Sequence, residues 1–168
     1  PGQQLGRGMM TLTWIAVLAA LTYFFGNWEE RQINPNRNPE SRISQGVREV
    51  VLQGNRRHHY VATGKINGQE VVYLLDTGAT DVVVPAKLAE RLKLKPGNRA
   101  YAMTANGRVE VRATMIDTLE LGDIELRNIR ASINPGMRGQ EILLGMSALK
   151  QVEFTQRGNQ LTLRQYEQ

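Results

Sequence analysis

Residues 71–80 read Val71-Val72-Tyr73-Leu74-Leu75-Asp76-Thr77-Gly78-Ala79-Thr80. Five apolar residues run directly into an acid, which is followed by a small hydroxyl residue and a glycine. Asp and Gly are common in turns, so the Asp-Thr-Gly tripeptide by itself also fits an ordinary turn at the end of a strand. However, an ionised carboxylate beside a buried strand is costly unless it has a purpose. The chain returns at once to Val82-Val83-Val84, which predicts a tight loop between two buried strands.

A second motif follows about seventy residues later, in the segment Ile142-Leu143-Leu144-Gly145-Met146-Ser147-Ala148-Leu149. Two aliphatic residues and a glycine at a strand-to-helix junction would alone indicate only core packing. Together with the acid motif, in this order and at this separation, the segment resembles the retropepsin family of aspartic proteases. More narrowly, the sequence is similar to the bacterial membrane-anchored retropepsin-like proteases. The resemblance covers roughly residues 46–166.

The resemblance implies a fold and a set of site residues. The expected fold is all-β, a closed barrel that corresponds to half of a pepsin-type bilobal protein, with one or two short helices. Asp76 matches the catalytic acid, Thr77 the hydroxyl residue that bonds to the partner's loop, and Gly78 the glycine whose N–H faces the carboxylate. Ala79 matches the small residue that follows, and Gly145 the glycine behind the loop, where close backbone approach is needed.

The resemblance also places the tip of a flap over the site. The expected tip consists of Thr104, Ala105, Asn106 and Gly107. One position departs from the viral pattern, because Thr80 stands where viral members often carry an acid. A salt bridge at that position is therefore not expected.

The number of acids predicts how the site is completed. Peptide hydrolysis by this route needs one carboxylate to deprotonate a water and a second, protonated one to polarise the scissile carbonyl. Asp81, Asp117 and Asp123 lack the setting of Asp76, and two of the three lie in predicted turns. The second carboxylate must come from another copy across a two-fold axis. We therefore expect a homodimer that acts on a polypeptide without metal or cofactor.

The rest of the chain predicts short strands joined by tight turns, which is typical of a barrel or sandwich. Asn-Gly is the strongest short hairpin signal, and it occurs at Asn67-Gly68 and Asn106-Gly107. Gly122-Asp123 and Gly158-Asn159 separate two further pairs of expected strands. The sequence indicates helices only at 86–92, after a proline, and at about 146–150.

The N-terminal region predicts a membrane anchor. No charged residue occurs from Gly8 to Trp28, and about 20 apolar residues in a helix span a bilayer. Arg7 precedes this stretch and Glu29-Glu30 follows it, so the positive-inside rule places the N-terminus in the cytoplasm. The rest of the chain would then be extracytoplasmic, which is periplasmic if the source is bacterial. A cleaved signal peptide, which would need small residues at the cleavage site, and a buried core helix are the alternatives.

These features predict four parts of the chain. A short tail at 1–8 precedes a transmembrane helix at 9–28. Asn34-Pro35 and Asn38-Pro39 mark residues 29–45 as a polar linker. Residues 46–168 would form the protease domain.

Composition excludes several other kinds of chemistry. The chain has 168 residues and no cysteine, which removes disulfides, thiolate catalysis and cysteine metal sites. The net charge of +5 comes from scattered basic residues without interleaved aromatics, which favours a solvated surface over a nucleic-acid interface. His58-His59 lacks further metal ligands, Ser147 lacks an orienting histidine, and Gly64-Lys65 lacks the rest of a phosphate loop.

The sequence therefore predicts an aspartic endopeptidase with an Asp76 dyad. The alternative is a catalytically silent dimeric β-barrel module that binds extended peptides by strand addition. Such a module would be expected to lack the acid or Gly78, and both are present. A nucleic-acid-binding domain would rest on the net charge alone and would show salt-dependent binding.

Overall fold

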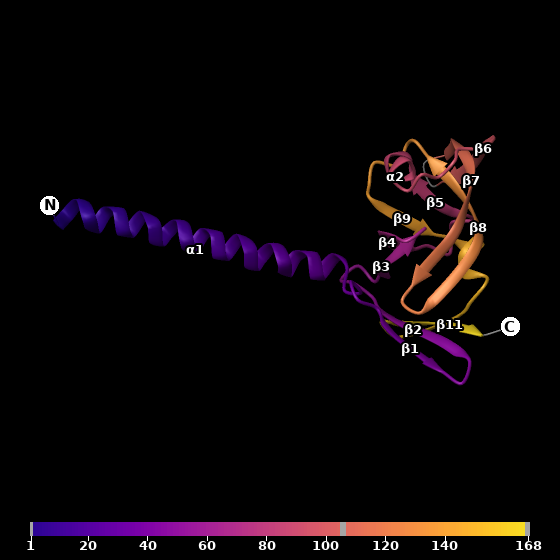
Figure 1. The fold of residues 1–168 in the computed structure, drawn as a ribbon, viewed down its shortest axis with the longest axis horizontal. Helices are drawn as coiled ribbons and strands as arrows, with labels where there is room; N and C mark the ends of the chain where they lie inside the picture. The colour runs from indigo at the N-terminus through magenta and orange to yellow at the C-terminus, as the bar shows by residue number, and fades with distance from the viewer. Residues whose placement is uncertain (1, 105–106, 167–168) are drawn as a thin grey trace. The chain divides into compact units, whose positions relative to one another are not determined.

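A computed structural model describes residues 2–104 and 107–166 and divides the chain into two compact units. The first unit, Pro1–Ile33, contains the helix α1 (Gly2–Ile33). The second unit, Asn34–Gln168, contains every described strand and both short helices (Figure 1). The second unit carries the motifs that the sequence singles out.

The larger sheet of the second unit closes on itself. In the described residues it has seven strands in the order β3-β4-β9-β5-β8-β7-β6, and a further pairing joins β3 to β7. This ring confirms the predicted barrel. The strands are β3 (Val61–Ile66), β4 (Gln69–Leu75), β5 (Val82–Pro85), β6 (Arg99–Thr104), β7 (Gly107–Leu121), β8 (Ile124–Asn134) and β9 (Glu141–Leu144).

Turn chemistry explains the pairing of neighbouring strands. Asn67 and Gly68 both have positive φ, 49° and 76°, which is the backbone of the two-residue turn that Asn-Gly favours. This turn joins β3 to β4 in antiparallel register. Gly122-Asp123 likewise joins β7 to β8, as predicted. Two pairings are parallel, β4 with β9 and β5 with β8, and they bring together segments that are distant in sequence.

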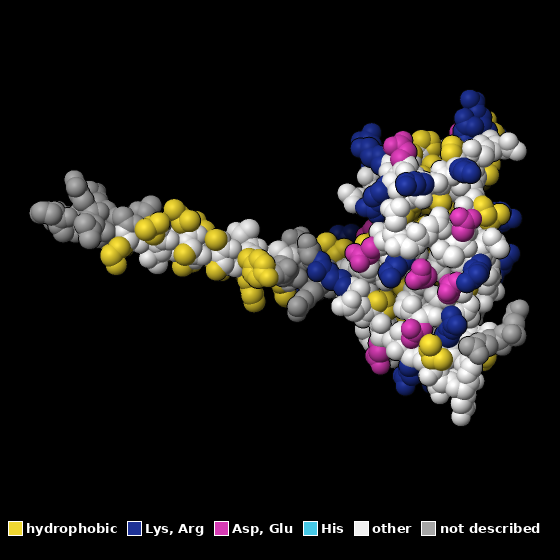
Figure 2. Space-filling view, in the orientation of Figure 1, with side chains coloured by type: hydrophobic (Ala, Val, Ile, Leu, Met, Phe, Trp, Pro, Cys, Tyr) yellow, Lys and Arg dark blue, Asp and Glu magenta, His cyan; other side chains and the backbone are white. Residues whose placement is uncertain are grey.

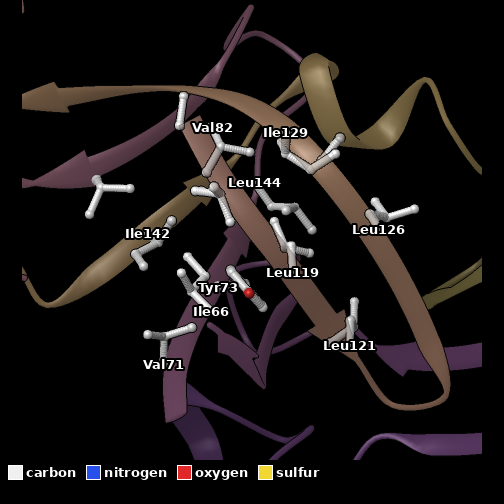
Figure 3. Close-up of a cluster of buried hydrophobic side chains, with 14 of the residues drawn as sticks. Ile66, Val71, Tyr73, Val82, Leu119, Leu121, Leu126, Ile129, Ile142 and Leu144 are labelled. Atoms are coloured by element: carbon white, nitrogen blue, oxygen red, sulfur yellow. The ribbon is translucent and has the colours of Figure 1, made fainter. Parts of the chain in front are cut away.

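The barrel interior is filled by fully buried aliphatic side chains around one aromatic ring (Figure 3). Tyr73 of β4 is completely buried, and its hydroxyl donates a hydrogen bond of 2.6 Å to the carbonyl oxygen of Lys65. Burial, with a smaller contribution from the charge of Glu120, raises the pKa of the Tyr73 phenol well above its usual value of 10.0. The alternate residues of β4 point away from this core.

The short helices confirm the two helical predictions, α2 (Ala86–Arg91) and α3 (Met146–Leu149). The helix α2 begins directly after Pro85, a residue that suits the start of a helix because it has no N–H to leave unpaired. The helix α3 follows Gly145 and buries Ser147, Ala148 and Leu149. The body is thus mostly β with two short helices.

A smaller sheet occupies part of the region predicted as a linker. It has four strands in the order β1-β2-β11-β10, which are β1 (Glu40–Ser44), β2 (Val47–Gln53), β10 (Glu153–Arg157) and β11 (Gln160–Tyr166). β1 lies within the predicted linker at 29–45. The compact unit already begins at Asn34, whereas the sequence placed the start of the domain at residue 46.

One charged row crosses all four strands of the smaller sheet. Arg42 contacts Glu49 at 3.2 Å, Arg164 contacts Glu49 at 2.7 Å, and Arg164 lies 3.7 Å from Glu153. The strand register places these residues directly opposite one another. Opposite charges in such cross-strand positions stabilise the pairing of neighbouring strands.

The helix α1 contains the predicted span at 9–28 and extends beyond it at both ends. Its described large apolar side chains from Met9 to Phe25 are all exposed (Figure 2). In the described part of the chain, no helix has both the length and the apolar character that crossing a membrane requires. The predicted transmembrane helix is therefore not confirmed.

Candidate active site

The segment from Asp76 to Asp81 connects β4 to β5 and is the loop that the acid motif predicted; we call it the acid loop. Asp76 is half-buried, and its N–H donates to the carbonyl oxygen of Leu144 at 3.2 Å. The Gly78 N–H donates to Asp76 Oδ1 at 2.9 Å, and the Ala79 N–H donates to the Asp76 carbonyl oxygen at 3.2 Å. Both carboxylate and backbone of Asp76 are therefore held by neighbouring N–H groups. The structure places Gly78 as the sequence predicted.

The start of α3 holds the far side of the acid loop. The Met146 N–H donates to the Ala79 carbonyl oxygen at 2.8 Å, and the Ser147 N–H donates to the Thr80 carbonyl oxygen at 2.9 Å. A Cβ on Gly145 would overlap the carbonyl oxygen of Asp81 and lie 2.7 Å from that of Ala79. Gly145 thus lies directly against the acid loop, where the resemblance placed it.

A buried hydroxyl joins three elements at the end of the loop. Ser147 Oγ donates to the carbonyl oxygen of Arg130 on β8 at 2.7 Å and accepts from the Val82 N–H at the start of β5 at 3.0 Å. In the sequence, Ser147 stands out only as a hydroxyl residue that lacks the orienting histidine of a nucleophile. Its structural role could not be read from local sequence, because both partners lie far away along the chain.

The acid Asp81 makes a contact that the sequence did not predict. Its Oδ1 lies 2.8 Å from Nε of Arg130, and the two side chains are 28% and 61% exposed. The sequence expected no salt bridge at Thr80, one position earlier. The ion pair exists at the next residue instead, and it engages the only other carboxylate of the acid loop.

A partly exposed apolar floor lies beside the acid loop. It is formed by Leu74 of β4, Leu143 of β9 and Val83 of β5, which are each half-buried. Strand pairing sets these three residues side by side, since Leu74 pairs with Leu143 and Leu143 with Val83. Of their neighbours along each strand, Leu75 is partly buried, and the others point into the barrel and are almost fully buried, namely Tyr73, Ile142, Leu144, Val82 and Val84. Asp76 lies two residues beyond Leu74 and so borders this floor.

The remaining predicted loop residues are accessible. Thr77 and Gly78 are exposed, and Ala79 is half-buried. The structure therefore brings Asp76, Thr77, Gly78, Ala79 and Gly145 together in one place. An exposed hydroxyl and an exposed backbone leave this side of the loop open to a second chain.

The predicted flap corresponds to the hairpin of β6 and β7. Thr104 and Gly107 are paired at its end, and Thr104 Oγ1 donates to the Gly107 carbonyl oxygen at 2.8 Å. Ala105 and Asn106 lie outside the described residues. On one face of the hairpin the guanidinium of Arg108 stacks on the Tyr101 ring, 3.7 Å from its centre.

The rejected motifs have structural explanations. His58 and His59 are exposed in a turn, and no group of three His, Asp or Glu side chains within residues 2–104 and 107–166 could hold a metal ion. A Cβ on Gly64 would overlap the Glu120 carbonyl oxygen and the Tyr73 ring, so close packing accounts for this glycine. Acidic and basic side chains are interspersed on the visible face of the second unit (Figure 2).

Comparison with protein families gives a match over the region that contains this site. Residues 62–151 match the family described as "gag-polyprotein putative aspartyl protease". The matched segment is more than half of the chain. It includes the acid loop, Arg130 and the start of α3.

The chain is also similar to two uncharacterized proteins and to one solved structure. An uncharacterized protein in the cobV 5′ region of Sinorhizobium sp is 32% identical over 173 residues, which cover 95% of this chain and 74% of the relative. The uncharacterized protein RP867 of Rickettsia prowazekii is 26% identical over 116 residues, 67% of this chain and 49% of that protein. A retropepsin-like aspartic protease from Rickettsia conorii shares the fold, with a TM-score of 0.61 and 24% identity over 74% of this chain and 96% of the other.

Proposed function

Because this chain belongs to the gag-polyprotein aspartyl protease family and has a mostly β, retropepsin-like fold, we propose that it is an aspartic endopeptidase formed by two copies. Asp76 of each copy would supply one carboxylate of the catalytic pair. The observation that carries this proposal is the fixed position of Asp76. Its main chain is tied to Leu144, its Oδ1 to the Gly78 N–H, and the Gly145 backbone lies directly behind its loop.

The proposed reaction uses the two carboxylates differently. In the dimer, one Asp76 would be ionised and take a proton from a water molecule, which attacks the scissile carbonyl carbon. The other Asp76 would be protonated and donate a hydrogen bond to the carbonyl oxygen, stabilising its developing negative charge. Two carboxylates at such close range oppose the ionisation of both, so one shared proton is the expected state. Within the described acid loop, Asp81 is engaged by Arg130, which supports taking the second acid from a partner.

The surroundings of Asp76 suit an extended peptide. The half-buried side chains of Leu74, Leu143 and Val83 would form an apolar floor under the substrate, on the side of the sheet that faces away from the core. Apolar substrate side chains would gain free energy by covering this floor. The hairpin of β6 and β7 would cover the peptide from the other side.

A silent peptide-binding module is the second candidate, because a sheet with an apolar floor can also bind a strand without cleaving it. Nothing in this alternative requires an ordered carboxylate at Asp76. The Gly78 hydrogen bond to the carboxylate and the Gly145 backbone packed behind its loop therefore favour the enzyme.

The decisive experiment replaces the carboxylate of Asp76 with an amide of nearly the same shape. Asp76→Asn in the full chain is nearly isosteric but cannot act as a base, so we expect no hydrolysis of an unfolded protein substrate at mildly acidic pH. Asp117→Asn is the matched control, because Asp117 is exposed on β7 and lies outside the site. The control should cleave at the normal rate and respond to an aspartic protease inhibitor. Turnover by pure, folded Asp76→Asn protein would refute the proposed mechanism.

The cellular location is a separate proposal that rests on the sequence alone. The uncharged stretch Gly8–Trp28, with Arg7 before it and Glu29-Glu30 after it, would hold the protein at a membrane with later residues on the extracytoplasmic side. In cells stripped of any outer membrane, protease added to the extracytoplasmic face should then reach the second unit. Protection of that unit, or release of the protein by high-salt washing, would contradict this location.

A further inference from the structure

A row of side chains crosses five strands on the face of the sheet that carries the apolar floor. Strand pairing links Leu74 to Leu143, Leu143 to Val83, Val83 to Ser132, and Ser132 to Ala113. Directly paired residues point to the same side of a sheet, so these residues share one face. The row therefore runs from the apolar floor on β4, β9 and β5 to the buried Ser132 on β8 and the half-buried Ala113 on β7.

A second row lies one step further along the same face. Side chains two residues apart on a strand point to the same side, so each position of the first row has a neighbour in the second. The second row consists of Arg130 on β8 and Met115 on β7, followed by Asp81, Gly145 and Asp76, which lie just beyond the ends of β5, β9 and β4. Contacts between its members support this alignment. The acid loop touches Gly145, Asp81 and Arg130 form an ion pair, and Met115 is paired with Arg130 across β7 and β8.

Strand spacing gives the approximate separation between Arg130 and the proposed catalytic acid. Neighbouring strands lie about 4.8 Å apart, so the three steps from β4 to β8 amount to roughly 14 Å along the curved sheet between the backbones at Asp76 and Arg130. An extended peptide advances about 3.4 Å per residue, so this distance corresponds to about four substrate residues. A substrate lying along the row would meet Arg130 about four residues from the bond to be cleaved.

Part of the Arg130 guanidinium is accessible to a ligand, because the rest of the residue is held by the protein. Its main-chain carbonyl oxygen is fixed by Ser147, and its Nε is fixed by Asp81 Oδ1. Within the described residues, no hydrogen bond involves its two terminal nitrogens, which carry four of the five guanidinium donors. At 61% exposure the arginine side chain is more accessible than Asp81 at 28%. Met115, 52% exposed beside it, provides an apolar contact for the methylene groups of an incoming side chain.

We propose that Arg130 selects peptide substrates that carry an acidic side chain about four residues from the cleaved bond. This inference rests on the proposed endopeptidase activity. The substrate carboxylate would bind the two terminal nitrogens of Arg130, a geometry that arginine and carboxylate groups readily adopt. Asp81 orients the guanidinium through Nε and also reduces its net attraction for anions. Because the dimer has two-fold symmetry, one Arg130 would lie toward each end of the substrate.

The test compares three fluorogenic peptides with the same apolar centre. They carry Gln at both outer positions, Glu at one, or Glu at both. With the full chain we expect kcat/KM to rise about two- to fivefold for each Glu, the range typical of exposed ion pairs, and the preference to shrink at high salt. Arg130→Gln should remove the preference while still cleaving the Gln peptide. Asp81→Asn, which frees Arg130 from its partner, should enlarge the ratio of Glu to Gln rates.

A matched control is present on the same strand. Arg127 is 73% exposed, and its Nε lies 2.7 Å from the Glu125 carboxylate, so it copies the local geometry of Arg130 away from the acid loop. Arg127→Gln should leave the Glu preference intact. If Arg130→Gln slows all three peptides equally, or the wild type shows no preference, Arg130 does not select substrates and the inference is wrong. If no peptide is cleaved even by the wild-type dimer, the proposed function itself fails, and the inference falls with it.

Discussion

At Gly145, space alone excludes a side chain. Its φ of −88° and ψ of −175° are open to any residue, so the backbone conformation does not require glycine. The restriction comes from the carbonyl oxygens of Asp81 and Ala79, which occupy the volume of a Cβ. Any substitution must therefore move the acid loop or the start of α3.

Gly145→Ala is expected to reduce both stability and activity. Overpacking of a close-packed junction typically costs about 1–3 kcal/mol, and a shift near 1 Å of a catalytic group can cost on the order of 100-fold in rate. Thermal melting and turnover should be measured on the same preparation. Gly139→Ala is the control, because the nearest atom to its Cβ would be the Glu141 nitrogen at 3.9 Å. A folded Gly145→Ala dimer with normal turnover would show that this glycine does not support the site.

Tyr73 predicts a pH dependence of stability. Burial raises the pKa of Tyr73 in the folded state above its unfolded value of about 10. The neutral phenol therefore contributes its full stabilisation of the fold below about pH 10, and this stabilisation is lost as the pH rises through the folded pKa. Tyr73→Phe removes the hydrogen bond to Lys65 and should lower stability at neutral pH by about 1 kcal/mol. Above pH 10 the difference between the two proteins should shrink. Denaturant titrations at pH 7 and pH 11 test this, and a constant difference would contradict it.

Single residues were predictable from the sequence to different degrees. Asp76, Gly78 and Gly145 stand in short patterns whose chemistry is local, and the structure brings them together as predicted. Arg130 and Ser147 gave no comparable signal. Their roles arise from contacts across 49 residues for Arg130 with Asp81 and 65 for Ser147 with Val82, which no local pattern records.

At the level of elements, the sequence predicted the hairpins and missed an edge strand. Asn-Gly and Gly-Asp turns mark the hairpins because the turn requires a positive φ at the glycine, as at Gly68 and Gly122. β1 is an exposed edge strand with polar residues such as Ser41 and Arg42, so it lacks the alternation of a half-buried strand. Its place in the sheet depends on pairing with β2.

The segment before β1 is held by a buried side chain. Asn36 is 4% exposed, and its amide nitrogen donates to the carbonyl oxygens of Val61 at 2.7 Å and Gln53 at 2.9 Å. Its Oδ1 accepts from the Gln53 N–H at 2.7 Å, and Asn34 Oδ1 accepts from the Asn36 N–H at 3.1 Å. These bonds make Asn34 a natural beginning for the folded unit.

Two truncated chains, one beginning at residue 34 and one at residue 37, should therefore differ in stability. A chain of residues 34–168 is expected to melt at the same temperature as the second unit of the full chain. A chain of 37–168 loses Asn36 and leaves buried backbone groups unpaired, each at about 1–3 kcal/mol, so its melting temperature should fall. Asn36→Ala in the longer chain should reproduce this loss, whereas Asn38→Ala, at an exposed position, should not. Equal melting of 34–168 and 37–168 would show that the Asn36 contacts add nothing.

For the whole molecule, the proposed site depends on concentration. A single copy holds one Asp76, so activity per subunit should fall on dilution as dimers separate. Turnover and sedimentation should be followed over the same concentration series. Adding excess Asp76→Asn protein to dilute wild type gives a sharper form of the test, because mixed dimers contain one functional acid and should be inactive. Unchanged specific activity where only monomers sediment would contradict the shared site.

The parallel pairing of β4 with β9 has a consequence for protein synthesis. Asp76 and Ser147 are 71 residues apart, yet the acid loop is held by Leu144, Gly145 and Ser147. At a translation rate of about 5–20 residues per second, roughly 4–14 s pass between their appearance on the ribosome. During that interval the acid has emerged without the segment that orders it. The proposed proteolytic site thus could not form until almost the whole domain had been made.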